Sequence, residues 1–62
     1  MSNEEIEDLK EKFDMGISMK FYEGEMDGRV LYFQDDSVFL CVGSEEIEVN
    51  LLDLKIENFE EL

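Results

Sequence analysis

The middle of the chain decides its fold, through the stretch Arg29-Val-Leu-Tyr-Phe-Gln34, Asp35-Asp36, Ser37-Val-Phe-Leu-Cys-Val42. Two apolar runs rich in β-branched and aromatic residues flank a pair of aspartates, and Asp favours tight turns because its side chain hydrogen-bonds nearby backbone. The stretch therefore predicts two antiparallel strands, 29–34 and 37–42, joined as a hairpin. Both runs carry apolar residues on both faces, so the face away from the core needs cover from a helix, a partner or a second copy.

The N-terminal segment predicts a helix that is one candidate for this cover. Ile6, Leu9 and Phe13 follow one another at spacings of three and four, which places them on one helical face. Ser2 opens a Ser-x-x-Glu capping box, and a glycine follows the last apolar position. We therefore expect a helix at about residues 3–14.

Alternation of apolar and polar residues predicts further strands on either side of the hairpin. We expect strands at residues 17–22, 46–51 and 54–59, connections at 23–28, 43–45 and 52–53, and a tail at 60–62. Residues 1–62 then form a single domain, with the helix at about 3–14 and a β-rich part at about 17–59.

This order of elements resembles the small barrels of the Sm-like and SH3-like families. The resemblance lies in Gly28-Arg-Val-Leu-Tyr-Phe33, the Asp35-Asp36 turn and the apolar strand after it, and it covers about residues 17–59. It implies an α+β fold in which an N-terminal helix precedes a four- to five-stranded antiparallel sheet or small barrel. The RNA-binding residues of the Sm type are missing, because Ser37 follows the turn and Asp53-Leu54-Lys55 is no basic-glycine element. The resemblance therefore implies a fold and no RNA binding.

Charge is the most unusual property of the composition. The 62 residues include 18 Asp and Glu against 5 Lys and Arg, which gives a net charge of −13. Phosphate backbones and anionic membranes are bound through Lys and Arg, so we expect neither nucleic acid nor membrane as a direct partner. The acidic N-terminus predicts no secretory signal, and the single cysteine fits a reducing cytosol, so we expect a cytoplasmic protein.

Catalytic and metal-binding patterns are weak. With no His and one Cys, a Ser–His–Asp or Cys–His arrangement is excluded within the chain, and we expect a protein that is not an enzyme and takes no cofactor. Cys41, between two apolar residues, is expected to be a buried structural thiol. Glu23, Glu25 and Asp27 match the spacing of a calcium loop, but Gln34 stands where that loop needs a bidentate Glu. We expect no metal site.

The acidic residues suggest a function. Five of them recur at helical spacings, and two form the central turn: Glu4, Glu7, Asp8, Glu11, Asp14, Asp35 and Asp36. Neighbouring carboxylates on a helix stand about 5–6 Å apart at Cβ, which is comparable to phosphate spacing along a nucleic-acid strand. These residues are our candidates for binding and blocking the basic surface of a nucleic-acid-binding protein. In size and charge the chain resembles the DNA-mimic inhibitors of phages, such as antirestriction and anti-CRISPR proteins.

Two other interpretations remain open at this point. The acidic stripe can be a solvated face that only keeps the protein soluble, although ordinary small domains manage with a net charge of about 2–8. Alternatively, the chain is a structural or adaptor module that docks or forms a homodimer through apolar strand surface. The contact residues would then be Tyr22, Phe33, Phe39 and Phe59.

Overall fold

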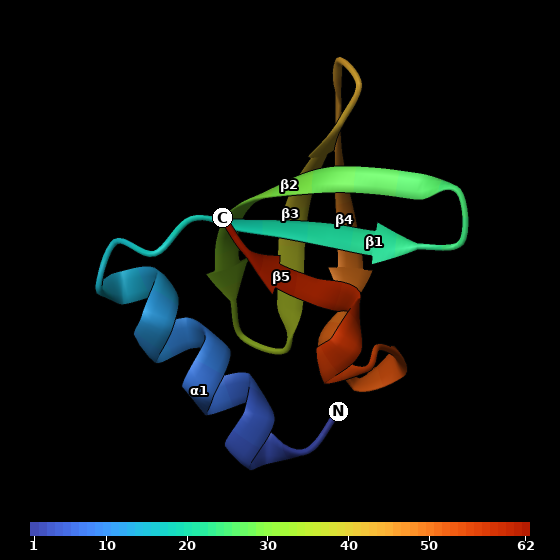
Figure 1. Cartoon of the computed structure of the whole chain (residues 1–62). Coiled ribbons are helices and arrows are strands. Elements are labelled where there is room, and N and C mark those ends of the chain that lie inside the picture. Colours follow the sequence, from blue (N-terminus) through green and yellow to red (C-terminus); the bar gives the residue numbers. More distant parts are fainter.

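The computed structural model describes the whole chain, Met1–Leu62. One α-helix precedes five strands and two short 3₁₀-helices (Figure 1): α1 (Asn3–Asp14), β1 (Met19–Glu23), β2 (Met26–Gln34), β3 (Ser37–Val42), β4 (Glu45–Asn50), η1 (Leu51–Asp53), η2 (Ile56–Asn58) and β5 (Phe59–Glu61). All strand pairs are antiparallel, and the order across the sheet is β4-β3-β2-β1-β5. The α+β fold class, a helix followed by a five-stranded antiparallel sheet, is confirmed.

The predicted helix is confirmed at both ends. At its start Oγ of Ser2 accepts a hydrogen bond from the Glu5 amide (3.3 Å), and Oε1 of Glu5 accepts one from the Ser2 amide (3.0 Å). These reciprocal bonds satisfy two donors that the first turn of a helix leaves without partners. Beyond the end of the helix, Gly16 has φ of 89°, a conformation that glycine adopts at little cost.

β2 is the strand that bends the sheet. Its first half pairs with β1, and its second half pairs with β3. The register shifts between Val30 and Tyr32, which is a β-bulge, and bulged strands bend and twist more strongly. As a result β1 runs across the direction of β3 (Figure 1). β4 and β5 form the two edges of the sheet and are not paired with each other.

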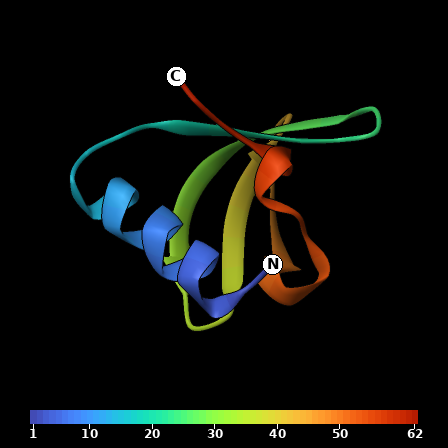
Figure 2. The same cartoon turned by 60° about the horizontal axis from the view of Figure 1, so that its bottom comes forward.

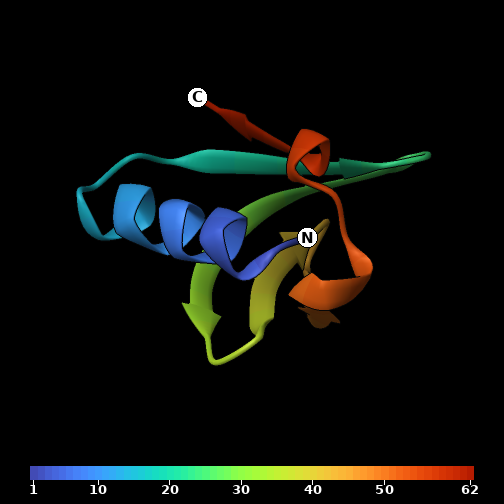
Figure 3. The same cartoon turned by 90° about the horizontal axis from the view of Figure 1, so that it is seen from below.

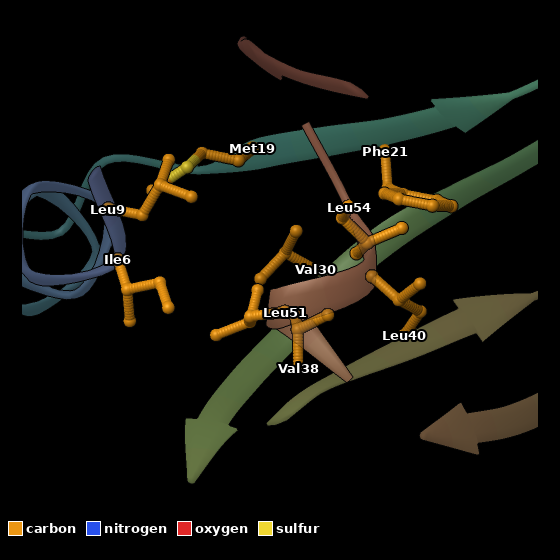
Figure 4. Close-up of a cluster of buried hydrophobic side chains, with 9 residues drawn as sticks. All are labelled: Ile6, Leu9, Met19, Phe21, Val30, Val38, Leu40, Leu51 and Leu54. Carbon is orange, nitrogen blue, oxygen red and sulfur yellow. The ribbon is translucent and has the colours of Figure 1, made fainter. Parts of the chain in front are cut away.

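The core lies inside the curve of this sheet, and α1 lies across its open side (Figure 2). Nine apolar side chains are buried there (Figure 4): Ile6, Leu9, Met19, Phe21, Val30, Val38, Leu40, Leu51 and Leu54. Edge-to-face aromatic contacts extend it, with ring centroids 5.5 Å apart for Phe13 and Phe33 and 5.4 Å apart for Phe21 and Phe59. The helix therefore covers the inner face of the sheet.

The predicted connection at 23–28 is wrong. Only Gly24 and Glu25 separate β1 from β2, and β2 begins at Met26. Gly24 has φ of 60°, so it provides the left-handed conformation that a two-residue hairpin turn requires. Glu23 and Asp27, two ligands of the calcium-like pattern, therefore lie in the strands of a tight hairpin.

The predicted fifth strand at 54–59 is also wrong. Lys55 and Asn58 flank a 3₁₀ turn, in which Oδ1 of Asn58 accepts a hydrogen bond from the Lys55 amide (2.8 Å). Nδ2 of Asn58 donates to the carbonyl of Tyr22 (2.7 Å), which ties this turn to β1. The residues expected to be a tail form β5 instead, with Glu60 opposite Lys20.

Candidate functional site

The five carboxylates predicted on the helix share one side of α1. At 3.6 residues per turn they span an arc of about 120°, centred nearly opposite the buried residues of the helix. All five are exposed: Glu4, Glu7, Asp8, Glu11 and Asp14. We call them the α1 acidic face. Because Ile6 and Leu9 are buried, the helix cannot turn on its axis, and this face stays directed at solvent.

Only one member of the α1 acidic face has an ion pair. Nζ of Lys12 lies 3.4 Å from Oδ2 of Asp8 and 3.1 Å from Oε1 of Glu61, which belongs to β5. Hydrogen bonds from Lys12 to Glu61 and then to Asp8 hold the pKa of this ammonium above its ordinary value of 10.5. The other four carboxylates have no cation within ion-pairing distance, so most of the charge on this face is uncompensated.

The N-terminal part of this face is slightly hollowed. Asn3, Glu4, Glu7, Asp8 and Glu11 line an open depression of about 380 Å³. No hydrophobic side chain lines it. The geometry suits contact with a cationic group from another molecule better than the enclosure of an apolar ligand.

Asp35 and Asp36 lie elsewhere. They form the exposed tip of the β2–β3 hairpin, which points away from α1 in Figure 3. Asp35 has φ of 53°, and the carbonyl of Asp36 accepts a hydrogen bond from the Leu51 amide (2.7 Å). The structure therefore brings the five residues of the α1 acidic face together, and Asp35 and Asp36 form a separate acidic site at the hairpin tip.

The rest of the surface is acidic as well. Of the 18 carboxylate side chains, Glu5 is half-buried and all others are exposed. Apart from the two ion pairs of Lys12, the chain has one more, between Lys20 and Asp27 at 3.9 Å. No group of three or more Asp, Glu or Cys side chains is arranged to hold a metal ion.

The apolar contact residues that we expected divide into two sets. Phe33 and Phe59 are half-buried and pack against the core, so only part of each ring is available for contact with another molecule. Tyr22 is exposed, and Phe39 is half-buried on the outer side of the sheet, where the Tyr32 ring stacks on it at 4.4 Å between centroids. Tyr32 is 40% exposed but is not among the expected contact residues, because strict alternation places it on the same face of the strand as Val30, which is buried.

Cys41 is half-buried on the same outer side, so the expectation of a buried thiol is wrong. Its Sγ donates to the Gly43 carbonyl (3.4 Å). β3 alternates strictly, with Val38 and Leu40 buried on the inner side, and position 41 therefore faces outward.

A scan of protein-family models, a search of curated proteins and a search of solved structures give no match to this chain. The 12-residue α1 is too short and too polar to cross a membrane, and the structure has no other α-helix.

Proposed function

We propose that this protein binds the basic surface of a nucleic-acid-binding protein and blocks it, in the manner of a DNA mimic. The observation that carries the proposal is the α1 acidic face: five exposed carboxylates on a helix anchored by its buried side, with a single ion pair among them. A function in phage anti-defence, as in the antirestriction and anti-CRISPR inhibitors that the chain resembles in size and charge, falls within this proposal.

The physical argument concerns spacing and rigidity. Adjacent carboxylates on a helix face stand about 5–6 Å apart at Cβ, so they offer a basic groove a regular row of negative charge. A nucleic-acid-binding groove is already lined with Lys and Arg that pair with phosphates, and a row of carboxylates can take the place of those phosphates. The clustered negative charge also steers the encounter of the two proteins from a distance.

Solubility alone is a weaker account of the charge. A small domain stays soluble with a net charge of about 2–8, and further like charge destabilises the folded state through self-repulsion. The chain carries −13 on 62 residues. A specific role for part of that charge explains why the chain tolerates such repulsion.

The first experiment is capture from a cell lysate on the immobilised protein at 50 and 200 mM salt. By analogy with DNA, a partner that contacts five charges loses about 10² to 10³ in affinity between these concentrations. The captured proteins are expected to elute with duplex DNA, which competes for the same groove, and not with neutral dextran. Elution by neither polymer, or capture insensitive to salt, would refute the proposal.

Two variants of equal net charge test the assignment of the site. In the first, the α1 acidic face is neutralised by Glu→Gln and Asp→Asn at all five positions. In the second, five exposed carboxylates without ion pairs are changed to Gln on other elements: Glu23, Glu25, Glu45, Glu57 and Glu60. Each variant removes five of the thirteen net negative charges. Only the first variant should lose affinity for the partner. An equal loss of affinity in both variants would show that binding depends on total charge and not on the α1 acidic face.

A further inference from the structure

The outer side of the β2–β3–β4 part of the sheet has no cover within the chain. We call the region where these three strands pair the outer sheet face and define it by the residues whose side chains lie there: Arg29, Leu31, Tyr32, Gln34, Ser37, Phe39, Cys41, Glu46, Glu48 and Asn50. Leu31 is 36% exposed and Tyr32 is 40% exposed. The Tyr32 and Phe39 rings stack nearly parallel, with 10° between their planes, and form an apolar centre for this face.

This face differs from the rest of the surface in charge. One cation and two carboxylates give it a net charge of −1, whereas the remainder of the chain carries the other −12 of the total. Two copies of so acidic a protein repel each other in most orientations. The outer sheet face is therefore the part of this side where two copies meet the least like charge, whereas the two Asp35-Asp36 turns come to lie at one end of a dimer about an axis along β3.

The register of the strands makes the face complementary to itself. Arg29, Cys41 and Glu46 lie side by side across the three strands, so the row has a positive end, a neutral middle and a negative end. The next row holds Tyr32 on β2, with Phe39 on β3 and Glu48 on β4. A two-fold axis along β3 places the β2 end of each row in one copy opposite the β4 end of the same row in the other copy.

We infer that a second copy of this chain binds the outer sheet face about this axis. Arg29 of each copy then lies opposite Glu46 of the other, and the Tyr32 hydroxyl lies opposite Glu48 of the other. The two Phe39 rings meet at the axis. α1 packs on the inner side of the sheet, so most of its acidic face stays free, although Asp14 at the end of α1 lines one pocket together with Tyr32. The inference does not depend on the proposed function.

The small size of the face makes the proposed dimer a weak one. Three strands about 4.8 Å apart, each about six residues long, cover roughly 14 by 20 Å of sheet. That is less than the about 800 Å² per partner of a standard stable interface, so the dimer belongs to the weak class. Because buried area alone does not fix affinity, dimerisation has to be measured at protein concentrations up to about 1 mM.

The first test is a charge exchange followed by sedimentation equilibrium at up to about 1 mM protein. Arg29→Glu and Glu46→Arg, each alone, place like charges across both symmetric contacts and should weaken the dimer at least about tenfold. The double variant restores opposite charges and should restore dimerisation. Lys55→Glu is the matched control, because Lys55 is exposed, lies outside the face and undergoes the same charge change as Arg29→Glu. Near-UV circular dichroism checks that each variant is folded.

The second test uses Cys41, the only cysteine of the chain. Packed sheets lie about 10 Å apart, so in the proposed dimer the two Cys41 side chains face each other at the axis and each thiol is covered by the other copy. Alkylation of Cys41 by N-ethylmaleimide should therefore slow as the protein concentration rises to about 1 mM, and Phe39→Glu should abolish this protection. A monomer at 1 mM, a double variant that stays monomeric, or a dimer whose Cys41 reacts as fast as that of the monomer would each overturn the inference. So would a monomeric chain whose outer sheet face captures a different protein.

Discussion

Replacing Leu9 with Ala should strongly destabilise this protein, because Leu9 joins α1 to the sheet. The side chain is only 4% exposed and is part of the buried cluster that includes Met19 of β1 (Figure 4). The α1 acidic face has a fixed direction only while this contact holds. Leu9→Ala therefore tests whether the helix is an integral part of the fold, as the proposed function requires.

The magnitude follows from burial. Leu→Ala removes three carbons, worth about 0.8 kcal/mol each when buried, and the cavity that remains brings the cost to about 3 kcal/mol. A 62-residue domain is stable by about 3–9 kcal/mol in total. The variant should therefore lose between a third and all of its stability, which corresponds to a fall of about 3 M in the urea midpoint at about 1 kcal/mol per M.

Urea denaturation with two probes measures this effect. Far-UV circular dichroism reports on α1, and tyrosine fluorescence reports on the sheet, which holds both tyrosines. The two transitions should coincide, because helix and sheet share one core. Leu52→Ala is the matched control: Leu52 is 52% exposed, and its loss should cost at most about 1 kcal/mol. A midpoint change below about 1 M for Leu9→Ala, or a helix that melts before the sheet, would refute the reasoning.

Three further predictions follow from the contacts of single groups and from total charge. The hydrogen bonds that Lys12 donates to Glu61 and Asp8 raise the pKa of Lys12 above its ordinary value of 10.5. These contacts therefore stabilise the fold fully below pH 10.5, and the stabilisation is lost as the pH rises through the raised pKa. In alkaline denaturation the free energy of unfolding should fall over this pH range, and the Lys12→Met variant should lack this part of the fall. Gly28→Ala should cost about 1–3 kcal/mol in thermal unfolding, since a Cβ there would lie 3.0 Å from Cγ2 of Val42. The urea midpoint of the unchanged protein should rise with added NaCl through screening of like charges, and a fall between low and moderate NaCl would contradict this.

The sequence predicts most where local chemistry decides the structure. The capping box at Ser2 and the spacing of Ile6, Leu9 and Phe13 depend on residues within one or two helical turns, and the helix is found at its predicted bounds. The β3 strand, Ser37–Val42, is likewise found as predicted, because a two-residue Asp turn defines its start.

Prediction fails where distant residues decide the structure. The run at 29–34 is apolar on both sides, so alternation cannot show that a bulge turns Leu31 and Tyr32 outward together. The end of the chain depends on the hydrogen bond from Asn58 to the Tyr22 carbonyl, 36 residues away, and no local pattern contains such a contact.

The same division applies to the candidate site. That five carboxylates share one side of α1 follows from the helical period alone, once Ile6 and Leu9 identify the buried side. That Asp35 and Asp36 stand apart from them depends on the path of β2 around the core, which only the three-dimensional structure gives. The outer sheet face could not be assigned for the same reason, since its rows combine residues from three strands.

The two proposals can be tested separately because they use opposite sides of the sheet. A dimer through the outer sheet face would carry two α1 acidic faces directed away from the interface, and linking two binding sites raises avidity toward a partner that has two basic grooves. A monomeric Arg29→Glu variant should then keep the affinity of a single α1 acidic face and lose only the avidity. A variant neutralised on α1 should dimerise as before, or more tightly, because ten negative charges have been removed from the pair. If Arg29→Glu instead abolished partner binding at every protein concentration, the partner site would include the outer sheet face, and the assignment to α1 alone would be wrong.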